Sequence, residues 1–308
     1  MRIAVMGTGG VGGYFGAKLA SFGNDVTFIA RGAHLEAIRE RGLEVRSPLG
    51  DIHLRQVRVT DDPLGVGRVD LVLFGVKLWD TERAAVAARN MIGPDTALVS
   101  FQNGVGKDEA LRLIVGEDAV MGSVCYIAAR IAAPGVIEHS GRMQKLVFGE
   151  YDGHGSSRAQ RLLEACRIAG IDAEVSPDIG RAIWDKFVFL VGLSGTTATV
   201  RGPIGKVRAN PRSRAFLLDA MREAVLVGRA HDVQLDPKLA EEKLAFCDAL
   251  PADMTSSMHH DLERGGRLEV RWLSGDVVAR GEAAGIATPV NRAIYDVLAP
   301  HEMGLRAA

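Results

Sequence analysis

The chain has 308 residues, which is long for one hydrophobic core and predicts two domains. Its formal net charge is −1 with no basic excess, which argues against nucleic acid or an anionic membrane as the main partner. No apolar run reaches the roughly 20 residues of a membrane span. The three cysteines, Cys125, Cys166 and Cys247, lie far apart and lack the spacing of metal ligands. We therefore expect a cytoplasmic protein with reduced thiols, no disulfide and no metal site.

The first half of the chain alternates between short apolar runs and helix-like segments. The expected strands are 2–7, 25–30, 43–47, 52–60, 69–77, 97–104, 119–131, 135–139, 145–151 and 172–176. The expected helices are 12–23, 33–42, 80–92 and 157–169. The segment PLGD between the third and fourth strands predicts a hairpin. Apolar strands that alternate with helices favour a mostly parallel sheet covered on both faces.

After Pro177 the strand signals end and helices follow one another. Asn210-Pro211 and Asp236-Pro237 each place a capping side chain before a proline at the first helical position. Gly285 is expected to end a helix, and Pro289 to begin the last one. The sequence therefore predicts an α/β domain at 1–180 and an all-helical domain at 181–308.

A G-x-G-x-x-G motif follows the first expected strand and opens the first expected helix. It consists of Gly7, Thr8, Gly9, Gly10, Val11 and Gly12. In this context the motif is a dinucleotide-binding fingerprint, so we expect all six residues to contact a cofactor in a Rossmann-type domain. Gly7 is expected to allow a tight turn, Gly9 a close approach of backbone to pyrophosphate, and Gly12 close packing of helix and strand.

The residue after the second expected strand indicates which cofactor is used. An NAD site places an acidic residue about 20 positions beyond the motif, where it holds the ribose hydroxyls. Here that strand ends in Arg31. A guanidinium group suits a 2′-phosphate, which a carboxylate would repel. The alternative is a solvated arginine, but the sequence favours NADPH.

Two polar residues stand at the ends of later strands. Lys77 ends LVLFGVK and Asn103 ends LVSFQN. Ligands bind at the carboxyl ends of parallel strands, so we expect Lys77 near the adenosine phosphates and Asn103 near the nicotinamide or the substrate. Gly75 is expected to let the cofactor or a helix approach its strand.

Lys186 stands at the head of a long apolar run, and the next charge is Arg201. One interpretation is that its stem lies on the core while the ammonium group reaches water. The other is that a rigid helix start presents the ammonium group to a site. The residues around Lys186 leave both interpretations open.

The chain resembles the ketopantoate reductase (2-dehydropantoate 2-reductase) family along nearly its whole length. The resemblance rests on the opening GTGGVGGYFGAKLA, Arg31, VK at 76–77, QNGVG at 102–106, WDKF at 184–187, TSSM at 255–258, Glu269 in LEVRWLSG, and GIATPVN near the end. It implies a Rossmann domain followed by a helical domain, with the active site in the cleft between them. The implied reaction is hydride transfer from NADPH to a 2-oxo acid, which gives a 2-hydroxy acid.

The resemblance also implies roles for individual residues. Lys186 matches the family's catalytic lysine and proton donor, and Glu269 matches an acid that contacts the cofactor and the catalytic group. Cofactor contacts are implied at Lys77, Ala129 and Asn103. Substrate contacts are implied at Asn103, Lys186 and Ser257. An ammonium group suits this reaction because it can stabilise the oxyanion that hydride addition creates and then protonate it. Two alternatives stay open: Glu269 as a surface acid paired with a neighbouring arginine, and Ser257 as a helix N-cap.

The chain departs from the family in the expected substrate pocket. Asparagines that bind the substrate one and two turns after the catalytic lysine are replaced by Leu190 and Ser194, and a third falls on Ile204. The loss of donors built for a substrate hydroxyl can change discrimination by orders of magnitude. Ser194, Thr196 or Thr197 is expected to supply replacement hydroxyls in a more apolar pocket, and we take Ser194 as a substrate contact.

The leading hypothesis is NADPH-dependent reduction of ketopantoate to pantoate in pantothenate biosynthesis. One alternative is a paralogue that reduces another branched or aromatic 2-oxo acid, which Leu190 and Ile204 favour. Another is a non-catalytic NADPH-binding sensor, which would need neither Lys186 nor Glu269. Apolar stretches of the helical domain favour a homodimer.

Overall fold

The computed structural model describes residues 1–305, and its chain divides into two compact units. The first unit comprises Met1–Gln102 and Lys107–Ile179. The second comprises the short segment Asn103–Gly106 and the chain from Gly180 onward. The last three residues of the predicted second domain, 306–308, lie outside the described residues.

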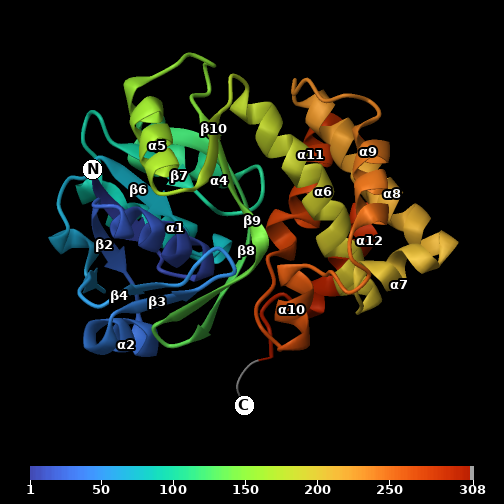
Figure 1. Cartoon of the computed structure of the whole chain (residues 1–308). Helices are drawn as coiled ribbons and strands as arrows, with labels where there is room; N and C mark the ends of the chain where they lie inside the picture. Colours follow the sequence, from blue (N-terminus) through green and yellow to red (C-terminus); the bar gives the residue numbers. More distant parts are fainter. Residues whose placement is uncertain (306–308) are drawn as a thin grey trace. The chain divides into compact units, whose positions relative to one another are not determined.

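The first unit is built on one sheet (Figure 1). Its strands are β1 (Arg2–Met6), β2 (Asp25–Ile29), β3 (Leu43–Arg46), β4 (Ile52–Leu54), β5 (Arg58–Thr60), β6 (Leu71–Phe74), β7 (Ala97–Ser100), β8 (Val120–Ala133), β9 (Val136–Gly149) and β10 (Asp172–Val175). The strand order is β4-β3-β9-β8-β7-β6-β1-β2-β5, with β10 paired to β9. All pairs are parallel except β3 with β4 and β8 with β9. The predicted mostly parallel α/β fold is confirmed.

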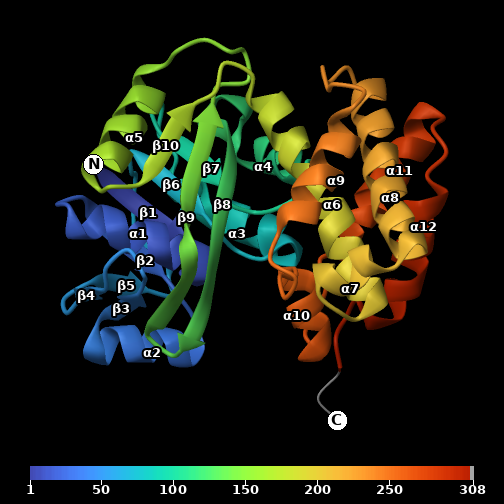
Figure 2. The same ribbon diagram turned by 45° about the vertical axis from the view of Figure 1, so that its right-hand side comes forward.

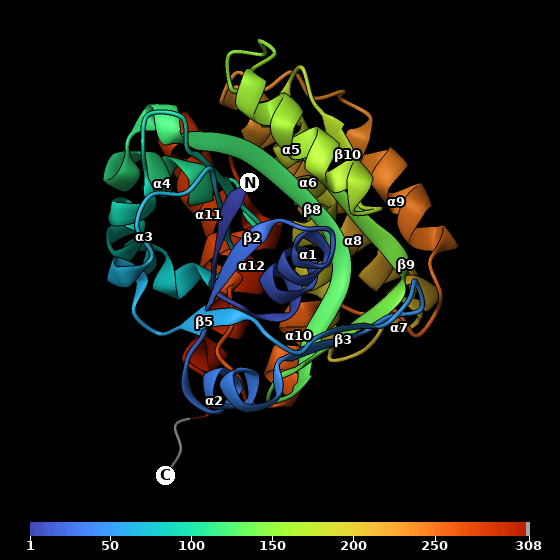
Figure 3. The same cartoon turned by 60° about the vertical axis from the view of Figure 1, so that its left-hand side comes forward.

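Helices cover both faces of the parallel strands (Figure 3). The helices of this unit are α1 (Gly10–Ser21), α2 (Gly32–Arg41), α3 (Thr81–Ala88), α4 (Lys107–Val115) and α5 (Ser157–Ile168). Short 3₁₀ turns are η1 (Pro63–Gly65), η2 (Leu78–Asp80), η3 (Arg89–Met91) and η4 (Glu117–Ala119). Ile3 and Val5 of β1 face a core with α1, α2 and α5, while Ala4 and Met6 face a second core with α3 and α4. Alternating side chains of a fully buried strand explain its continuous apolar sequence.

Two strand predictions were wrong in their extent. The run 52–60, predicted as one strand, forms β4, which pairs antiparallel with β3, and β5, which pairs parallel with β2. Each half forms its backbone hydrogen bonds at a different edge of the sheet. Most of the segments predicted separately at 135–139 and 145–151 lies in the single strand β9 (Figure 2). A bulge in the pairing of β9 with β8 absorbs the residues between them. Helix α4 is an element that the sequence analysis did not predict.

The described part of the second unit is helical and contains no strand, which confirms the prediction for this region. Its helices are α6 (Ile179–Val200, beginning at the last residue of the first unit), α7 (Ile204–Ala209), α8 (Pro211–Ala230), α9 (Leu239–Ala249), α10 (Ser257–Glu263), α11 (Ser274–Ala284) and α12 (Pro289–Leu298). Two 3₁₀ turns are η5 (Val270–Trp272) and η6 (Ala299–His301). None of the helices described over residues 1–305 has the length and hydropathy that a bilayer span requires.

Capping residues and prolines explain several helix boundaries in this unit. Asn210 Oδ1 accepts hydrogen bonds from the backbone of the first turn of α8 at 2.9 and 3.3 Å, and Gly285 ends α11 with φ of 68°. Pro289 begins α12, whose backbone donates to the buried Glu223. The Asp236-Pro237 prediction was wrong by a few residues: Asp236 caps the preceding turn by accepting from Lys238 N at 2.8 Å, and α9 begins at Leu239.

Candidate active site

The glycine loop joins β1 to α1 and is held against the neighbouring strands. Thr8 donates from its backbone N and from Oγ1 to the carbonyl of Ile29, at 3.0 and 2.9 Å. Gly7 has φ of 98°, and a Cβ there would lie 2.8 Å from the backbone N of Val76. Because only glycine accommodates both constraints, Gly7 forms the tight turn that the fingerprint requires.

The other glycines of the loop divide into packed and open positions. A Cβ on Gly10 would collide with the carbonyl of Ala129, and one on Gly12 with the carbonyl of Gly7. A Cβ on Gly9 would meet nothing within 4 Å. Gly9 is the N-cap of α1, where partial positive charge and exposed N–H groups favour an anion. The residues present therefore fit the pyrophosphate of a dinucleotide.

Gly75 lies where its strand meets the glycine loop and the start of α1. Its backbone N donates to Met6 O at 2.8 Å. A Cβ at Gly75 would lie 3.3 Å from Gly7 O and 3.5 Å from Gly12 Cα. The absent side chain therefore makes room for the glycine loop and for the first turn of α1, which confirms the expectation that a helix approaches this strand.

The remaining predicted cofactor residues of the first unit lie on several elements. Lys77 follows β6 and is exposed, with Nζ 5.5 Å from the centre of the Trp79 ring. Val11 is half-buried in α1 and packs on the core that α1 shares with the sheet. Ala129 is half-buried in β8, and its carbonyl contacts α1 at Gly10.

Arg31 follows β2 and forms an ion pair that the sequence analysis did not predict. Its Nη2 lies 2.9 Å from Asp80 Oδ2, and the Arg31 side chain is 65% exposed. Asp80 Oδ1 also binds Arg83 Nη2 at 2.9 Å. Arg31 therefore keeps an exposed guanidinium beside a second cation, with one acid between them.

In the second unit the structure brings together two predicted site residues. Lys186 Nζ donates to Asn103 Oδ1 at 3.0 Å, across 83 positions of sequence. Lys186 is half-buried on α6, and Asn103 is half-buried in the segment Asn103–Gly106. An amide oxygen has acceptor lone pairs for an ammonium group, so Asn103 fixes one direction of the lysine head.

The segment that carries Asn103 rests on the turn that carries Glu269. Gly104 has φ of 87°, and a Cβ there would lie 3.1 Å from Trp272 O. Trp272 N donates to Glu269 O at 3.0 Å, and Glu269 is 9% exposed. The interpretation of Glu269 as a surface acid is therefore wrong, because its side chain is buried.

Positions that differ from the family pattern lie at different depths. Leu190, one turn beyond Lys186, is half-buried. Ser194 is 1% exposed, and its Oγ has no hydrogen-bond partner within residues 1–305. Ile204 is fully buried at the start of α7, where its backbone N donates to Met254 O at 2.8 Å.

The adjacent serines of TSSM have separate positions. Ser256 is the N-cap of α10: its Oγ accepts from His259 N at 3.1 Å and lies 3.0 Å from Thr197 Oγ1. Ser257 is the first residue of the helix and is exposed. The alternative that Ser257 is the N-cap was therefore wrong.

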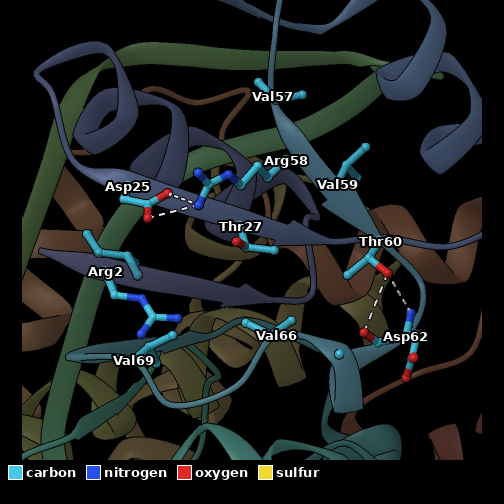
Figure 4. A pocket seen from close by; sticks show the side chains of 12 residues that line it. Arg2, Asp25, Thr27, Val57, Arg58, Val59, Thr60, Asp62, Val66 and Val69 are labelled. Carbon is cyan, nitrogen blue, oxygen red and sulfur yellow. Dashed lines mark hydrogen bonds and ion pairs between the residues drawn. The ribbon is translucent and has the colours of Figure 1, made fainter.

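A pocket of about 500 Å³ in the first unit contains none of the predicted site residues (Figure 4). It includes Arg2 and Asp25, the first residues of β1 and β2, and so the amino ends of these strands. Arg58 donates to both oxygens of Asp25 there, at 2.7 and 2.9 Å. Within residues 1–305, this pocket included, no three His, Cys, Asp or Glu side chains are placed to hold a metal ion.

Sequence reasoning missed two sets of charged residues near the predicted site. Asp80 follows Lys77 by three positions, but nothing in the sequence signals that it pairs with Arg31, 49 positions earlier. Lys107 and Asp108 follow the QNGVG motif and form a buried pair at 2.9 Å, and Tyr151 Oη donates to Asp108 at 2.7 Å. A run of charges after a glycine is typical of a solvated helix start, so the sequence carried no signal of burial.

Comparisons with known proteins identify the family. Residues 3–153 match the family described as Ketopantoate reductase PanE/ApbA, and residues 178–302 match its C-terminal family. The chain belongs to the ketopantoate reductase family. A 2-dehydropantoate 2-reductase of Halobacterium salinarum is 34% identical over 97% of this chain and 98% of its own length. The chain is therefore an oxidoreductase of the ketopantoate reductase family, with both of its domains present.

Solved structures of similar proteins agree with this assignment. A PanE/ApbA family ketopantoate reductase from Ralstonia eutropha superposes with a TM-score of 0.90, at 33% identity, over 98% of both chains. A D-mandelate dehydrogenase in ternary complex with NADH and anilino(oxo)acetate gives a TM-score of 0.88 at 20% identity, over 98% of both chains. The second likeness shows the ketopantoate reductase fold and nothing about the substrate of this chain.

Proposed function

We propose that the chain reduces ketopantoate to pantoate with NADPH, in pantothenate biosynthesis, and that Lys186 is the proton donor. The observation that carries this proposal is the hydrogen bond between Lys186 Nζ and Asn103 Oδ1. Two polar residues on separate segments converge there, and both match the family's site residues. Membership of the ketopantoate reductase family supports the same reaction.

The first unit supports the proposal by its fit to a dinucleotide. When bound, NADPH supplies the hydride. The open backbone at Gly9 receives its pyrophosphate, and the exposed guanidinium of Arg31 binds the 2′-phosphate through charge-assisted hydrogen bonds. Lys77 adds positive charge on the next loop. Bound NADPH is thus held chiefly by anion-binding groups of this unit.

The proposed chemistry of Lys186 follows from where charge develops. As the carbonyl carbon of the 2-oxo acid gains hydride, its oxygen becomes negative. The Lys186 ammonium stabilises this oxygen and donates a proton to it, which completes the alcohol. Asn103 holds the ammonium in one direction, and Glu269, on the turn that contacts Gly104, positions the same group. Ser257 binds the substrate with its exposed hydroxyl.

A second candidate function is the reduction of a different 2-oxo acid. It is favoured by the half-buried Leu190, one helical turn from Lys186, where the family places an asparagine. An apolar side chain there cannot pair the hydroxyl of ketopantoate, and it suits a branched or aromatic substituent. The chemistry of Lys186 is the same in both proposals.

The test is consumption of NADPH by the purified chain with ketopantoate and with a panel of branched and aromatic 2-oxo acids. NADH runs in parallel, and Lys186→Ala serves as the blank. The proposal predicts the highest kcat/KM for ketopantoate with NADPH. A high value for an apolar 2-oxo acid alone would contradict the substrate and support the second candidate. If NADPH binds and no acid is reduced, the chain is a cofactor-binding sensor.

A further inference from the structure

Three charged side chains meet at the carboxyl edge of the sheet: Arg31 after β2, Asp80 at the end of η2, and Arg83 in the first turn of α3. Asp80 is only 19% exposed, and each of its carboxylate oxygens binds a different guanidinium. Arg31 and Arg83 are 65% and 71% exposed, and each lies 2.9 Å from Asp80. Each guanidinium has five N–H donors, so the contact with Asp80 leaves donors on both arginines directed elsewhere. We call these three residues the charge cluster.

The topology places the charge cluster beside the glycine loop. Arg31 follows β2, and Asp80 ends η2, which follows β6. Both strands pair in parallel with β1, whose carboxyl end leads into the glycine loop. The backbone N of Thr8 donates a hydrogen bond to Ile29 O at the end of β2, and the backbone N of Gly75 donates one to Met6 O at the end of β1. The cluster therefore joins the two loops that border the proposed pyrophosphate site.

We propose that Arg83 is a second cation of the 2′-phosphate site and that Asp80 limits its preference for NADPH over NADH. The inference rests on the proposed use of NADPH and extends it to two residues with no assigned role. Asp80 draws both guanidiniums to one point, where a phosphate would receive donors from each. The cluster carries a net charge of +1, from two cations and one anion.

The opposing action of Asp80 follows from its charge. A carboxylate next to the two arginines repels the 2′-phosphate of NADPH, whereas it accepts a hydrogen bond from the 2′-hydroxyl of NADH. Exposed ion pairs order their side chains only weakly. If the negative charge of Asp80 is removed, binding of the 2′-phosphate gains more from the lost repulsion than it loses from the weaker ordering of the two arginine side chains. Arg83 and Asp80 are expected to act in opposite directions on the same ligand.

The experiment measures binding to the apoprotein by titration calorimetry, so it does not depend on turnover. The ligands are adenosine 2′,5′-bisphosphate and 5′-AMP, which differ only in the 2′-phosphate, followed by NADPH and NADH. The variants are Arg83→Met and Asp80→Asn. The matched control is Arg58→Met, because Arg58 is 72% exposed and forms a similar ion pair with Asp25 at the opposite end of β2.

For Arg83→Met we expect a rise of about tenfold in the Kd of the 2′,5′-bisphosphate and of NADPH, with 5′-AMP and NADH unchanged. For Asp80→Asn we expect those two constants to fall by about threefold and the Kd of NADH to rise. Arg58→Met should change none of them.

An unchanged 2′-phosphate preference in Arg83→Met, or equal weakening of all ligands in Asp80→Asn, would overturn the inference. If wild-type protein does not prefer the 2′-phosphate ligands, the proposed NADPH specificity fails as well. Loss of preference in Arg31→Met alone would retain that specificity and reject the roles of Arg83 and Asp80.

Discussion

Lys186 illustrates how a single residue acquires its position from distant sequence. The ammonium group lies on a helix whose following residues, from Val191 to Ala198, are buried, and Asn103 supplies an oxygen at 3.0 Å. A hydrogen bond from a charged donor is strong, and it also restricts the direction in which the donor group points. We therefore treat Asn103 as the residue that aims the proposed proton donor.

Asn103→Ala is expected to lower kcat by about 100-fold, because the Lys186 ammonium loses the partner that directs it at the substrate oxygen. Asn103 is also an expected cofactor contact, but the NADPH Kd, measured by calorimetry, should change by less than about threefold, since the pyrophosphate and 2′-phosphate contacts remain. Asn103→Asp keeps an acceptor oxygen and should recover part of kcat. A kcat equal to that of the wild type in Asn103→Ala would contradict the positioning role.

Two glycines of the same loop offer a matched comparison. Gly9→Ala adds a methyl group that meets no protein atom within 4 Å, so thermal stability should be unchanged while NADPH affinity falls at least about tenfold. Gly12→Ala places its methyl group against Gly7 O and should lower stability by about 1–3 kcal/mol. Thermal unfolding and calorimetry on both variants check this. Normal NADPH binding by Gly9→Ala would contradict the placement of the pyrophosphate at Gly9.

At the scale of residues, the sequence predicted what depends on local chain geometry. The glycine loop was predictable because its strand–turn–helix context is contiguous. The Arg31–Asp80 pair was not, because it joins loops on either side of β1. Ser194 and Ile204 are buried, and the resemblance to the family did not indicate how deep they lie.

At the scale of elements, α10 shows how adjacent identical residues take different roles. Ser256 has extended backbone angles, φ −106° and ψ 160°, so its hydroxyl faces the free N–H groups of the first turn. Ser257 is already helical and exposed. The sequence TSSM predicts a helix start, but either serine satisfies the pattern.

Ser256→Ala is expected to destabilise the protein by about 1 kcal/mol, because it removes the cap of α10 and a partner of Thr197. Ser257→Ala should leave stability within about 0.5 kcal/mol of the wild type, since an exposed hydroxyl is lost. Under the proposed function it should raise KM for the 2-oxo acid. Denaturant unfolding and steady-state kinetics separate the two effects, and the reverse assignment would contradict the structure.

At the scale of the folded chain, a half-buried ion pair between Arg158 and Glu150 makes the stability of the first unit depend on pH. In the first unit, Arg158 binds both oxygens of Glu150 at 2.7 Å and also donates to the backbone carbonyls of Thr96 and Asp118. Burial alone would raise the pKa of Glu150, but the hydrogen bonds from Arg158 and Ser156 outweigh it and hold the pKa below its usual value. The ionised form of Glu150 therefore stabilises the fold.

A lowered carboxyl pKa contributes stability above its unfolded pKa, and this stability is lost as the pH falls through the folded value. Glu150→Gln should cost about 3 kcal/mol at pH 7, and the gap from the wild type should shrink below about pH 4. Glu164→Gln is the control, because Glu164 forms an exposed pair with Arg167 and should change stability little. A Glu150→Gln gap that stays constant from neutral pH to about pH 3 would contradict this linkage.

The chain order alone could not predict the composition of the two units. A change from strands to helices near residue 180 was visible in the sequence, but four residues, Asn103–Gly106, belong with the later helices. Gly104 and Gly106 allow this segment to contact η5 and α11 closely. Long-range packing, which no local pattern records, thus places Asn103 in the same unit as Lys186.

Lys186→Ala tests whether Lys186 protonates a 2-oxo acid that NADPH reduces. We would measure kcat for the best 2-oxo acid and, separately, the NADPH Kd by calorimetry. We expect kcat to fall by about 1,000-fold or more, with the NADPH Kd nearly unchanged. A kcat near that of the wild type, with cofactor affinity intact, would contradict the claim.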